Sequence, residues 1–421
     1  MQVESTRCIL IGLDCPQTAG LWPTEESLSE LAELAKTAGL TTVSIIAQRR
    51  QEPDHRTYVG KGKVEEIKFD IDRTGASVVI ADDELSPIQQ RNLETELKVK
   101  ILDRTGLILD IFASRAQTHE AQLQVELAQL SYLAPRLTRM WTHLSRLGGG
   151  IGTRGPGEKQ LEVDKRRMRD RISHLKEEIE KVRAHRQRHR SQRQKVPILT
   201  ATLVGYTNAG KSTLMNRLTP AQVLAENKLF ATLDPTTRRL RIPGGEPLLL
   251  TDTVGFIQKL PHQLVDAFRA TLEEVEDATL ILHVVDISHP RFVEMMKTAD
   301  ALLKSLDIGE KQQLIVFNKV DRLRDPVFLK MLQKTYPDSI GISAEYQSDL
   351  TPLFDKISEI LNRTREEMTF HIPYSRMDVV HLLHENAQIL SEDHAEHITL
   401  QVRIQKTIGE KMMGMLGKGS H

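Results

Sequence analysis

Apolar residues in the first part of the chain form short runs separated by helical patterns. Residues 8–13, 42–47 and 78–81 are apolar runs that predict buried strands. Between the first two runs, Leu28, Leu31, Leu34 and Ala35 have helical spacing and predict a helix over 27–38 that stops at Gly39. Another helix is expected from Pro87 to Leu97. Alternating strands and helices are typical of a parallel sheet, so residues 1–115 are expected to form an N-terminal α/β domain.

A seven-residue apolar repeat follows. The first seam is formed by Leu123, Leu127, Leu130, Ala134, Leu137, Trp141 and Leu144, and the second by Leu161, Met168, Ile172, Leu175, Ile179 and Val182. Each helix alone would expose its apolar stripe, so residues 116–195 are expected to form a long antiparallel helical hairpin. Pro135 is expected to kink the first helix.

Apolar runs return after residue 196. Strands are expected at 199–204, 248–250, 280–286 and 314–317, with a closing amphipathic helix at 350–361. This predicts an α/β domain over residues 196–364, with a mostly parallel sheet flanked by helices.

The last segment, residues 365–421, is expected to be a small C-terminal α/β domain. Apolar residues alternate with polar ones at 368–372 and again at 398–404, which predicts two half-buried strands. The residues between them, 378–390, are expected to form a helix. The whole chain is thus expected to be a multidomain α/β protein.

The strand predicted at 199–204 leads into Gly205–Ser212, a full match to the pattern G-x-x-x-x-G-K-[ST], with a helical pattern behind it. This is the strand, loop and helix arrangement that wraps nucleotide phosphates. Lys211 can neutralise the β- and γ-phosphates, and the Ser212 hydroxyl can bind Mg²⁺.

The base is indicated by Asn318-Lys319-Val320-Asp321, after the strand predicted at 314–317. A carboxylate at Asp321 can accept hydrogen bonds from the ring N–H and the amine of guanine, whereas adenine has neither donor there. Asn318 can tie this loop to the phosphate loop. Ser343-Ala344 fits the last loop that contacts the base. The motif order predicts a GTPase.

Two further segments lie between these motifs. In Thr251-Asp252-Thr253-Val254-Gly255, Asp252 can hold Mg²⁺ through water, and the Gly255 N–H can meet the γ-phosphate. A threonine between 230 and 238 is expected to sense Mg²⁺ and the γ-phosphate. Spacing alone does not choose among Thr232, Thr236 and Thr237.

The predicted hairpin differs from the rest of the chain in its charge. The protein has 57 basic and 57 acidic residues, so its formal net charge is zero. The second predicted helix is strongly basic, with no acidic residue between Arg183 and Lys195. Such an imbalance favours a phosphate backbone as partner. The connecting loop, residues 148–158, is rich in glycine and can bring its backbone close to RNA.

Composition indicates the cellular compartment and limits the kinds of partner. Two cysteines argue for a reducing compartment without a disulfide framework, and aromatic residues are too few, at 4%, for extensive base stacking. The longest N-terminal apolar run is too short for a signal or membrane segment. We expect a cytoplasmic, monomeric protein with no transmembrane segment, for which peripheral association with a membrane stays open.

The sequence resembles the HflX family of ribosome-associated GTPases, in the Obg-HflX-like group. The resemblance covers nearly the whole chain. It rests on the GTPase motifs, on Phe230–Pro235 and Asp252–Phe256, and outside them on Tyr58–Lys63, Asp103–Ile111 and Gly149–Glu158. The family's Mg²⁺-sensing threonine falls on Thr232. The resemblance implies binding to the large ribosomal subunit and splitting of stalled or idle ribosomes, particularly under stress.

The expected site follows from the motifs and the resemblance together. Catalytic roles are expected for Lys211, Thr232 and Gly255, and Mg²⁺ ligation for Ser212 and Thr232, with Asp252 acting through water. GTP-binding residues are Gly205, Tyr206, Thr207, Asn208, Ala209, Gly210, Lys211, Ser212, Thr213, Phe230, Ala231, Thr232, Leu233, Asp234, Asp252, Thr253, Val254, Gly255, Asn318, Lys319, Val320, Asp321, Ser343, Ala344 and Glu345. RNA-binding candidates are Gly149, Gly150, Gly152, Arg154, Gly155, Gly157, Arg166, Arg167 and Arg169.

Phe256 stands where Ras-like enzymes place a glutamine that orients the attacking water. We therefore expect slow intrinsic GTP hydrolysis that the ribosome stimulates.

Two alternative functions belong to other classes of protein. One is a GTP-dependent assembly or checkpoint factor that binds RNA without splitting ribosomes. The other is an ATP-dependent RNA-remodelling enzyme that uses Gly60–Lys63, within the turn-like segment Tyr58–Lys63, as a second phosphate-binding site.

Overall fold

The computed structural model describes residues 6–16, 22–140, 156–193, 199–219, 229–230, 232–242, 247–259, 275–276, 278–305, 311–363 and 365–417. The chain divides into two compact units. The first unit contains residues 1–182 together with 227–234 and 257–269. The second contains residues 183–226, 235–256 and 270–421. Two short segments of the predicted GTPase region therefore cluster with the N-terminal residues.

The first unit is built on a parallel sheet of four strands in the order β2-β1-β3-β4. The strands are β1 (Arg7–Asp14), β2 (Thr41–Arg49), β3 (Val78–Ala81) and β4 (Lys100–Asp103). The helices are α1 (Thr24–Thr37), α2 (Lys61–Thr74), α3 (Pro87–Leu97) and α4 (Arg104–Arg115). The parallel sheet and three of its strands were predicted from the apolar runs, whereas the short strand β4 was not.

Local sequence explains where these helices begin and end. Ser86 caps α3 by accepting a hydrogen bond from the Gln89 N–H, and the Gln89 side chain caps the Ser86 N–H in return. The Asp103 carboxylate accepts from the Gly106 N–H and starts α4 immediately after β4. Asp103 and Arg104 are thereby placed at the carboxyl edge of the sheet.

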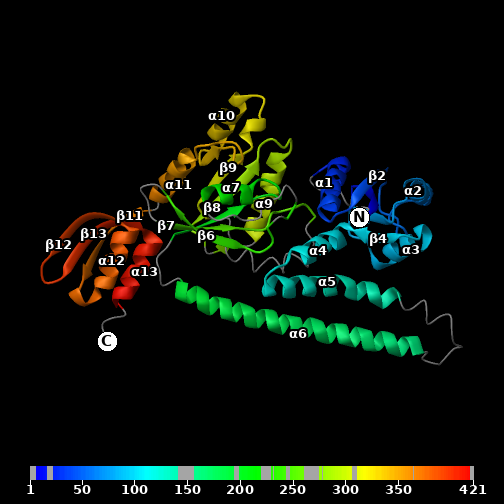
Figure 1. Ribbon diagram of the computed structural model, residues 1–421, viewed down its shortest axis with the longest axis horizontal. Helices are drawn as coiled ribbons and strands as arrows, with labels where there is room; N and C mark the ends of the chain where they lie inside the picture. Colours follow the sequence, from blue (N-terminus) through cyan, green and yellow to red (C-terminus); the bar gives the residue numbers. More distant parts are fainter. Residues whose placement is uncertain are drawn as a thin grey trace, which may run out of the picture. The chain divides into compact units, whose positions relative to one another are not determined.

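The hairpin is formed by α5 (His119–Met140) and α6 (Pro156–Arg193), which lie side by side (Figure 1). Leu123, Leu175 and Ile179 form its buried core, with Leu127, Leu130 and Val182 packed against them. The Arg171 guanidinium binds the Glu126 carboxylate across the two helices at 2.8 Å. The predicted seams therefore meet in this part of the hairpin, and α5 continues through Pro135. Trp141 and Leu144 lie outside the described residues.

The second unit contains a six-stranded sheet in the order β10-β9-β8-β5-β7-β6. The strands are β5 (Leu199–Val204), β6 (Thr236–Arg241), β7 (Pro247–Asp252), β8 (Leu280–Asp286), β9 (Gln313–Asn318) and β10 (Ser339–Gly341). All neighbours are parallel except β6 and β7. The accompanying helices are α7 (Lys211–Leu218), α9 (Phe292–Ser305), α10 (Pro326–Thr335) and α11 (Thr351–Arg363), with a 3-10 turn η3 (Val320–Arg322).

The C-terminal part is a three-stranded antiparallel sheet in the order β11-β13-β12. It consists of β11 (Arg365–Ile372), η4 (Tyr374–Arg376), α12 (Met377–Asn386), β12 (Gln388–His394), β13 (Ile398–Gln405) and α13 (Lys406–Gly417). The helix expected over 378–390 was too long. Ala387 is extended, and Ile389 pairs with Val402 in the sheet. Pairing with β13 thus overrides the helical pattern there. Within the described ranges, the helices lack the length and apolarity needed to cross a membrane.

Candidate nucleotide site

The phosphate loop joins β5 to α7 through two glycines that no other residue could replace without strain. Gly205 has φ 146°, and a Cβ built on it would lie 2.2 Å from the Val284 carbonyl oxygen. Gly210 has φ 96°, and its Cβ would lie 2.2 Å from Asn318 Nδ2. Positive φ and missing side chains let the backbone turn tightly ahead of a helix start, as phosphate binding requires.

Lys211 is buried at the first position of α7. Its Nζ donates to the carbonyl oxygens of Gly205 and Tyr206 at 3.1 and 2.8 Å. Burial lowers the pKa of Lys211 to about 8, and the nearby Asp252 carboxylate only partly opposes this. Below about pH 8 the Lys211 ammonium group is therefore charged, and it lies against the backbone of the phosphate loop.

Ser212 and Asp252 form the oxygen-rich side of the site. The Ser212 hydroxyl donates to Asp252 Oδ2 at 2.8 Å, and Asp252 is fully buried at the end of β7. A hydroxyl and a carboxylate beside a phosphate cradle are the oxygen ligands that suit Mg²⁺, directly or through water. Thr253 and Val254 are buried next to them, and the Thr253 hydroxyl donates to the Leu203 carbonyl at 2.6 Å. Thr213 is half-buried on α7.

The segment after Asp252 is fastened to the phosphate loop. The Phe256 N–H donates to the Gly205 carbonyl at 3.0 Å, and its carbonyl accepts from the Thr207 N–H at 2.8 Å. A Cβ on Gly255 would lie 2.8 Å from Thr207 Cα and 2.9 Å from Lys211 Nζ. Gly255 is thus pressed against the loop, and the side chain of Phe256 is buried.

Asn318 links the base loop to the phosphate loop, as predicted from the sequence. Its Nδ2 donates to the Ala209 carbonyl at 2.8 Å, and its Oδ1 accepts from the Ala344 N–H at 2.9 Å. Lys319 donates to the Asn208 carbonyl at 2.9 Å and pairs with Asp286 at 2.7 Å. The Asn318 side chain, at the end of β9, therefore links the loops that follow β5 and β10.

Asp321 lies on η3, and its Oδ1 accepts from the Ser343 hydroxyl at 2.5 Å. The Val320 N–H donates to the Ile342 carbonyl at 3.2 Å. Glu345 is exposed, and its carbonyl accepts from Arg217 at 3.2 Å. Ser343, Ala344 and Glu345 therefore lie beside the Asp321 loop, where the base-contacting residues were expected.

The three threonines that the sequence left open lie in two different segments. Thr236 and Thr237 belong to β6 and pair with Asp252 and Thr251. Thr232 precedes that strand, is buried, and follows Phe230, which packs edge-on against Phe112 at 4.6 Å. Leu233 is also buried, and Ala231 lies outside the described residues. Thr236 and Thr237 are thus part of a strand, whereas Thr232 lies in the non-strand segment before it.

Asp234, two residues after Thr232, binds the two residues that precede the first hairpin helix, of which Thr118 caps the helix. Its Oδ2 accepts from the N–H groups of Gln117 and Thr118 at 3.0 and 3.2 Å, and its Oδ1 accepts from the Thr118 hydroxyl at 2.5 Å. The Thr118 hydroxyl in turn accepts from the Ala121 N–H. An anion at a helix start is stabilising. The sequence placed Asp234 in the GTP site but gave no sign of this contact.

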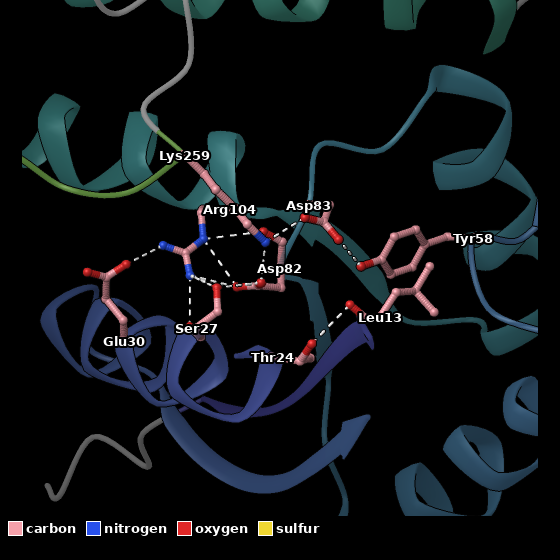
Figure 2. A network of polar contacts seen from close by, with 9 residues as sticks. All are labelled: Leu13, Thr24, Ser27, Glu30, Tyr58, Asp82, Asp83, Arg104 and Lys259. Carbon is pink, nitrogen blue, oxygen red and sulfur yellow. Dashed lines mark hydrogen bonds and ion pairs between the residues drawn. The ribbon is translucent and has the colours of Figure 1, made fainter. Parts of the chain in front are cut away.

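Sequence reasoning also missed a buried ionic network at the carboxyl edge of the N-terminal sheet (Figure 2). Arg104 Nη2 binds Asp82 Oδ1 at 2.6 Å, and its Nη1 binds Glu30 Oε2 at 2.6 Å. Lys259 Nζ lies 2.6 Å from both Asp82 Oδ2 and Asp83 Oδ1. Burial alone would raise the pKa of Asp82, but Arg104 and Lys259 outweigh it and lower the pKa. The network therefore keeps Asp82 ionised inside the protein.

A second buried cluster explains the segment Asp103–Ile111, one of the motifs that carried the resemblance. Asp103 accepts from the Tyr132 hydroxyl at 2.7 Å and from Arg136 Nη2 at 3.0 Å. Tyr132 and Arg136 lie on α5, and a Cβ on Gly106 would lie 3.0 Å from the Tyr132 hydroxyl. The motif thus anchors the first hairpin helix to the N-terminal sheet.

Contacts within the protein also explain the segment Tyr58–Lys63. The buried Tyr58 donates its hydroxyl to Asp83 Oδ2 at 2.6 Å. The Gly60 N–H donates to Gln48 Oε1 at 2.8 Å, and a Cβ on Gly60 would lie 2.6 Å from an Arg50 nitrogen. Lys63 pairs with Glu66. These contacts favour a structural turn over a second phosphate site.

The RNA-binding candidates are only partly described. Arg166, Arg167 and Arg169 are exposed on α6. Gly157 lies in the first turn of that helix. Gly149, Gly150, Gly152, Arg154 and Gly155 lie outside the described residues. The exposed arginines keep the hairpin available to a negatively charged partner.

Comparisons with known proteins support the interpretation of this region as a GTP site. Family models for a GTP-binding GTPase N-terminal region, a GTP-binding GTPase middle region and a 50S ribosome-binding GTPase match residues 25–113, 115–193 and 200–319. The "GTPase HflX" of Lacrimispora saccharolytica is 50% identical over 370 residues, covering 88% of this chain and 87% of the relative. That of Escherichia coli K12 is 46% identical over 349 residues, covering 83% and 82%.

Among solved structures, one described as SsGBP in complex with GDP is 26% identical, covers 85% of this chain and 99% of its own, and has a TM-score of 0.51. Its similarity extends beyond the nucleotide-binding sheet to most of the chain. Together with the phosphate loop, the base loop and the curated relatives, it leads to one conclusion: this chain is a GTPase that belongs to the HflX family.

Proposed function

We propose that this protein binds the large ribosomal subunit in its GTP-bound form and splits stalled or idle ribosomes, particularly under stress. The observation that carries the proposal is the group of exposed arginines on α6. The first helix of the same hairpin begins directly after Gln117 and Thr118, which bind Asp234, two residues from Thr232. The family model matching residues 200–319 is described as a 50S ribosome-binding GTPase, which supports this partner. Family relatives match most of the chain, hairpin included.

In this proposal the phosphate loop, Gly205–Thr213, wraps the GTP phosphates, and Lys211 neutralises their charge. Mg²⁺ would be held by Ser212 and Thr232, with Asp252 acting through water, and would neutralise charge on the β- and γ-phosphates. Asp321 would accept hydrogen bonds from guanine, with Ser343–Glu345 closing over the base. Phe230–Asp234 and Asp252–Gly255 would contact the γ-phosphate side, where the Gly255 N–H donates.

Hydrolysis is expected to be slow in the isolated protein. Phe256 has no polar group to orient the attacking water, and its side chain is buried. The ribosome would therefore raise the rate by ordering the segments around Thr232 and Gly255. Loss of the γ-phosphate would release both segments and end binding, as in other order–disorder switches.

Light scattering of intact ribosomes tests the proposal. With GTP, the wild-type protein should lower the scattering signal as subunits separate. Replacing Arg166, Arg167 and Arg169 together with glutamine should abolish the decrease. The matched control replaces Arg238 and Arg239, which are exposed on β6, and should behave as wild type.

The same measurement addresses the second candidate, a GTP-dependent assembly or checkpoint factor. Such a factor would bind large subunits with GTP yet leave the scattering of intact ribosomes unchanged. Binding without any decrease in scattering would therefore refute splitting and favour the checkpoint function.

A further inference from the structure

We propose that Asp286 is a positioning residue for guanine-nucleotide binding, which acts by holding the Lys319 side chain between the base loop and the phosphate loop. The proposal rests on the proposed roles of the phosphate loop and of Asp321 in binding GTP, and not on ribosome splitting. All the residues involved belong to the second compact unit. Asp286 ends β8 and is the register partner of Asn318, which ends the parallel strand β9. Asp286 and Lys319 therefore lie at the carboxyl ends of adjacent strands.

Lys319 connects the two loops that a nucleotide has to span. Its backbone lies in the base loop, two residues before Asp321, and its Nζ donates to the Asn208 carbonyl of the phosphate loop at 2.9 Å. A nucleotide with its base at Asp321 and its phosphates in the phosphate loop extends between the same two loops. A lysine stem is flexible, so it takes one fixed course only where its charged end is held. The position of the Lys319 ammonium group therefore influences the shape of the nucleotide site.

Asp286 holds that ammonium group. Lys319 Nζ lies 2.7 Å from Asp286 Oδ2, and each of the two side chains is only 17% exposed. An ion pair that is largely shielded from water is stronger than one on the surface. Since the ammonium group has three donors, it can bind the Asn208 carbonyl and the Asp286 carboxylate together. The carboxylate thus fixes the end of the lysine from a second side.

Asp286 is itself oriented by the turn that follows β8. The Ser288 N–H donates to Asp286 Oδ1 at 3.0 Å, and the Ser288 hydroxyl donates to the same oxygen at 2.5 Å. Ser288 therefore binds one carboxylate oxygen and Lys319 binds the other. Both oxygens have to accept, which an ionised carboxylate can do and an amide cannot. Asparagine at this position is nearly isosteric but has to give up one of the two contacts.

Two uncommon backbone conformations meet at the hydrogen bond that Asp286 supports. Lys319 has φ 64° and Asn208 has φ 60°, in a region that few residues other than glycine adopt. Such conformations persist where surrounding contacts hold them, and they cluster at ligand sites. The Ile287 N–H also donates to the Asn318 carbonyl at 3.1 Å, which fastens the turn after β8 to the base loop. These contacts favour a role for Asp286 in shaping the nucleotide site.

Calorimetry of the full-length protein with GDP and with a non-hydrolysable GTP analogue tests the proposal. Asp286→Asn should weaken the binding of both nucleotides by roughly 10-fold, because the end of the Lys319 side chain is no longer held. The two affinities should fall by the same factor, since Lys319 is not placed at the γ-phosphate. Glu367→Gln is the matched control. It removes an exposed ion pair with Arg403 in the same unit and should leave both affinities unchanged.

Two further measurements separate positioning from a purely structural role. In a double-mutant cycle, Asp286→Asn should cause no further loss of GDP affinity in a Lys319→Met background, because the two residues act through one contact. In single-turnover hydrolysis at saturating GTP, Asp286→Asn should keep a rate within about twofold of wild type, because the ion pair does not touch the reacting atoms.

Unchanged affinities in Asp286→Asn, additive losses in the cycle, or a single-turnover rate that falls together with the affinity would each overturn the proposal. Tighter GDP binding would also overturn it, because the carboxylate would then oppose the phosphates instead of positioning Lys319. A different variant tests the GTP site itself. If Asp321→Ala kept the wild-type preference for GTP over ATP, the base-reading role of Asp321 would be wrong, whatever the result for Asp286→Asn.

Discussion

The phosphate loop and the Asp82–Arg104 network are both buried polar assemblies at the carboxyl ends of parallel strands, but they are built differently. In the phosphate loop, Lys211 bonds to carbonyls five and six residues away. In the network, Arg104 meets Glu30 and Asp82, which are 74 and 22 residues away, and Lys259 meets Asp82 across 177 residues. The first assembly is a local property of the sequence, and the second exists only in the folded chain.

This difference has a functional consequence. The phosphate loop takes its turn from its own glycines and helix start, and Asn318 and Phe256 add contacts from elsewhere in the same unit. A long-range network depends on the whole first unit, so it is suited to stability and to coupling. Variants in the two assemblies should therefore affect different measurements.

The largest effect is expected for Arg104→Met. It leaves Asp82 and Glu30 buried without their guanidinium, which should lower the free energy of unfolding by about 3–5 kcal/mol. Urea unfolding followed by circular dichroism measures this. Lys63→Met, which breaks a partly exposed ion pair, should cost no more than about 0.5 kcal/mol. A loss below about 1 kcal/mol in Arg104→Met would mean that the network is not a stability element.

Lys211→Ala should produce the opposite pattern. Removing the cation that faces the phosphates should weaken GTP binding by roughly 100- to 1,000-fold, while the urea midpoint stays close to wild type. Calorimetric titration with GTP measures the affinity. Tight GTP binding by this variant would contradict the assignment of the phosphate loop.

Asn318→Ala should have an intermediate effect, because it removes the link between the base loop and the phosphate loop. The Ala209 carbonyl and the Ala344 N–H would lose their buried partner, so GTP affinity should fall roughly 10- to 100-fold. GDP affinity should fall by a similar factor, since neither contact involves the γ-phosphate. A selective loss of GTP binding alone would show that Asn318 acts elsewhere.

The smallest effect is a pH dependence. Burial depresses the pKa of Lys211 to about 8, so the free protein loses this proton as the pH rises through 8. Nucleotide binding favours the charged form, and affinity should therefore decline above pH 8, by at most about tenfold per pH unit. Calorimetry between pH 7 and pH 9.5 would show this decline. A flat profile in that range would contradict it.

The local assembly could be predicted from the sequence almost completely. The glycine spacing at 205 and 210 identified the phosphate loop, and Asn318 was expected to tie the base loop to it, which the hydrogen bond to Ala209 confirms. The choice of Thr232 over Thr236 and Thr237 required either the family resemblance or the strand pairing of β6. The residues' roles in binding GTP stay proposals.

The long-range assembly could not be predicted, for a physical reason. Asp82 and Asp83 appeared in the sequence only as a turn after a strand, and Arg104 only as part of a motif. Local spacing gives no sign that Arg104 will be buried between two carboxylates, with only 1% of its side chain exposed. In the C-terminal sheet, Ile389 likewise fitted a helical pattern until its pairing with Val402 placed it in a strand.

Pelleting of purified large ribosomal subunits tests the central claim, that the guanine nucleotide state governs ribosome binding through the hairpin. Full-length protein should pellet with the subunits in GTP or a non-hydrolysable analogue and stay in the supernatant with GDP. The variant with Arg166, Arg167 and Arg169 replaced by glutamine should stay in the supernatant with either nucleotide. Equal pelleting with GTP and GDP would contradict the claim.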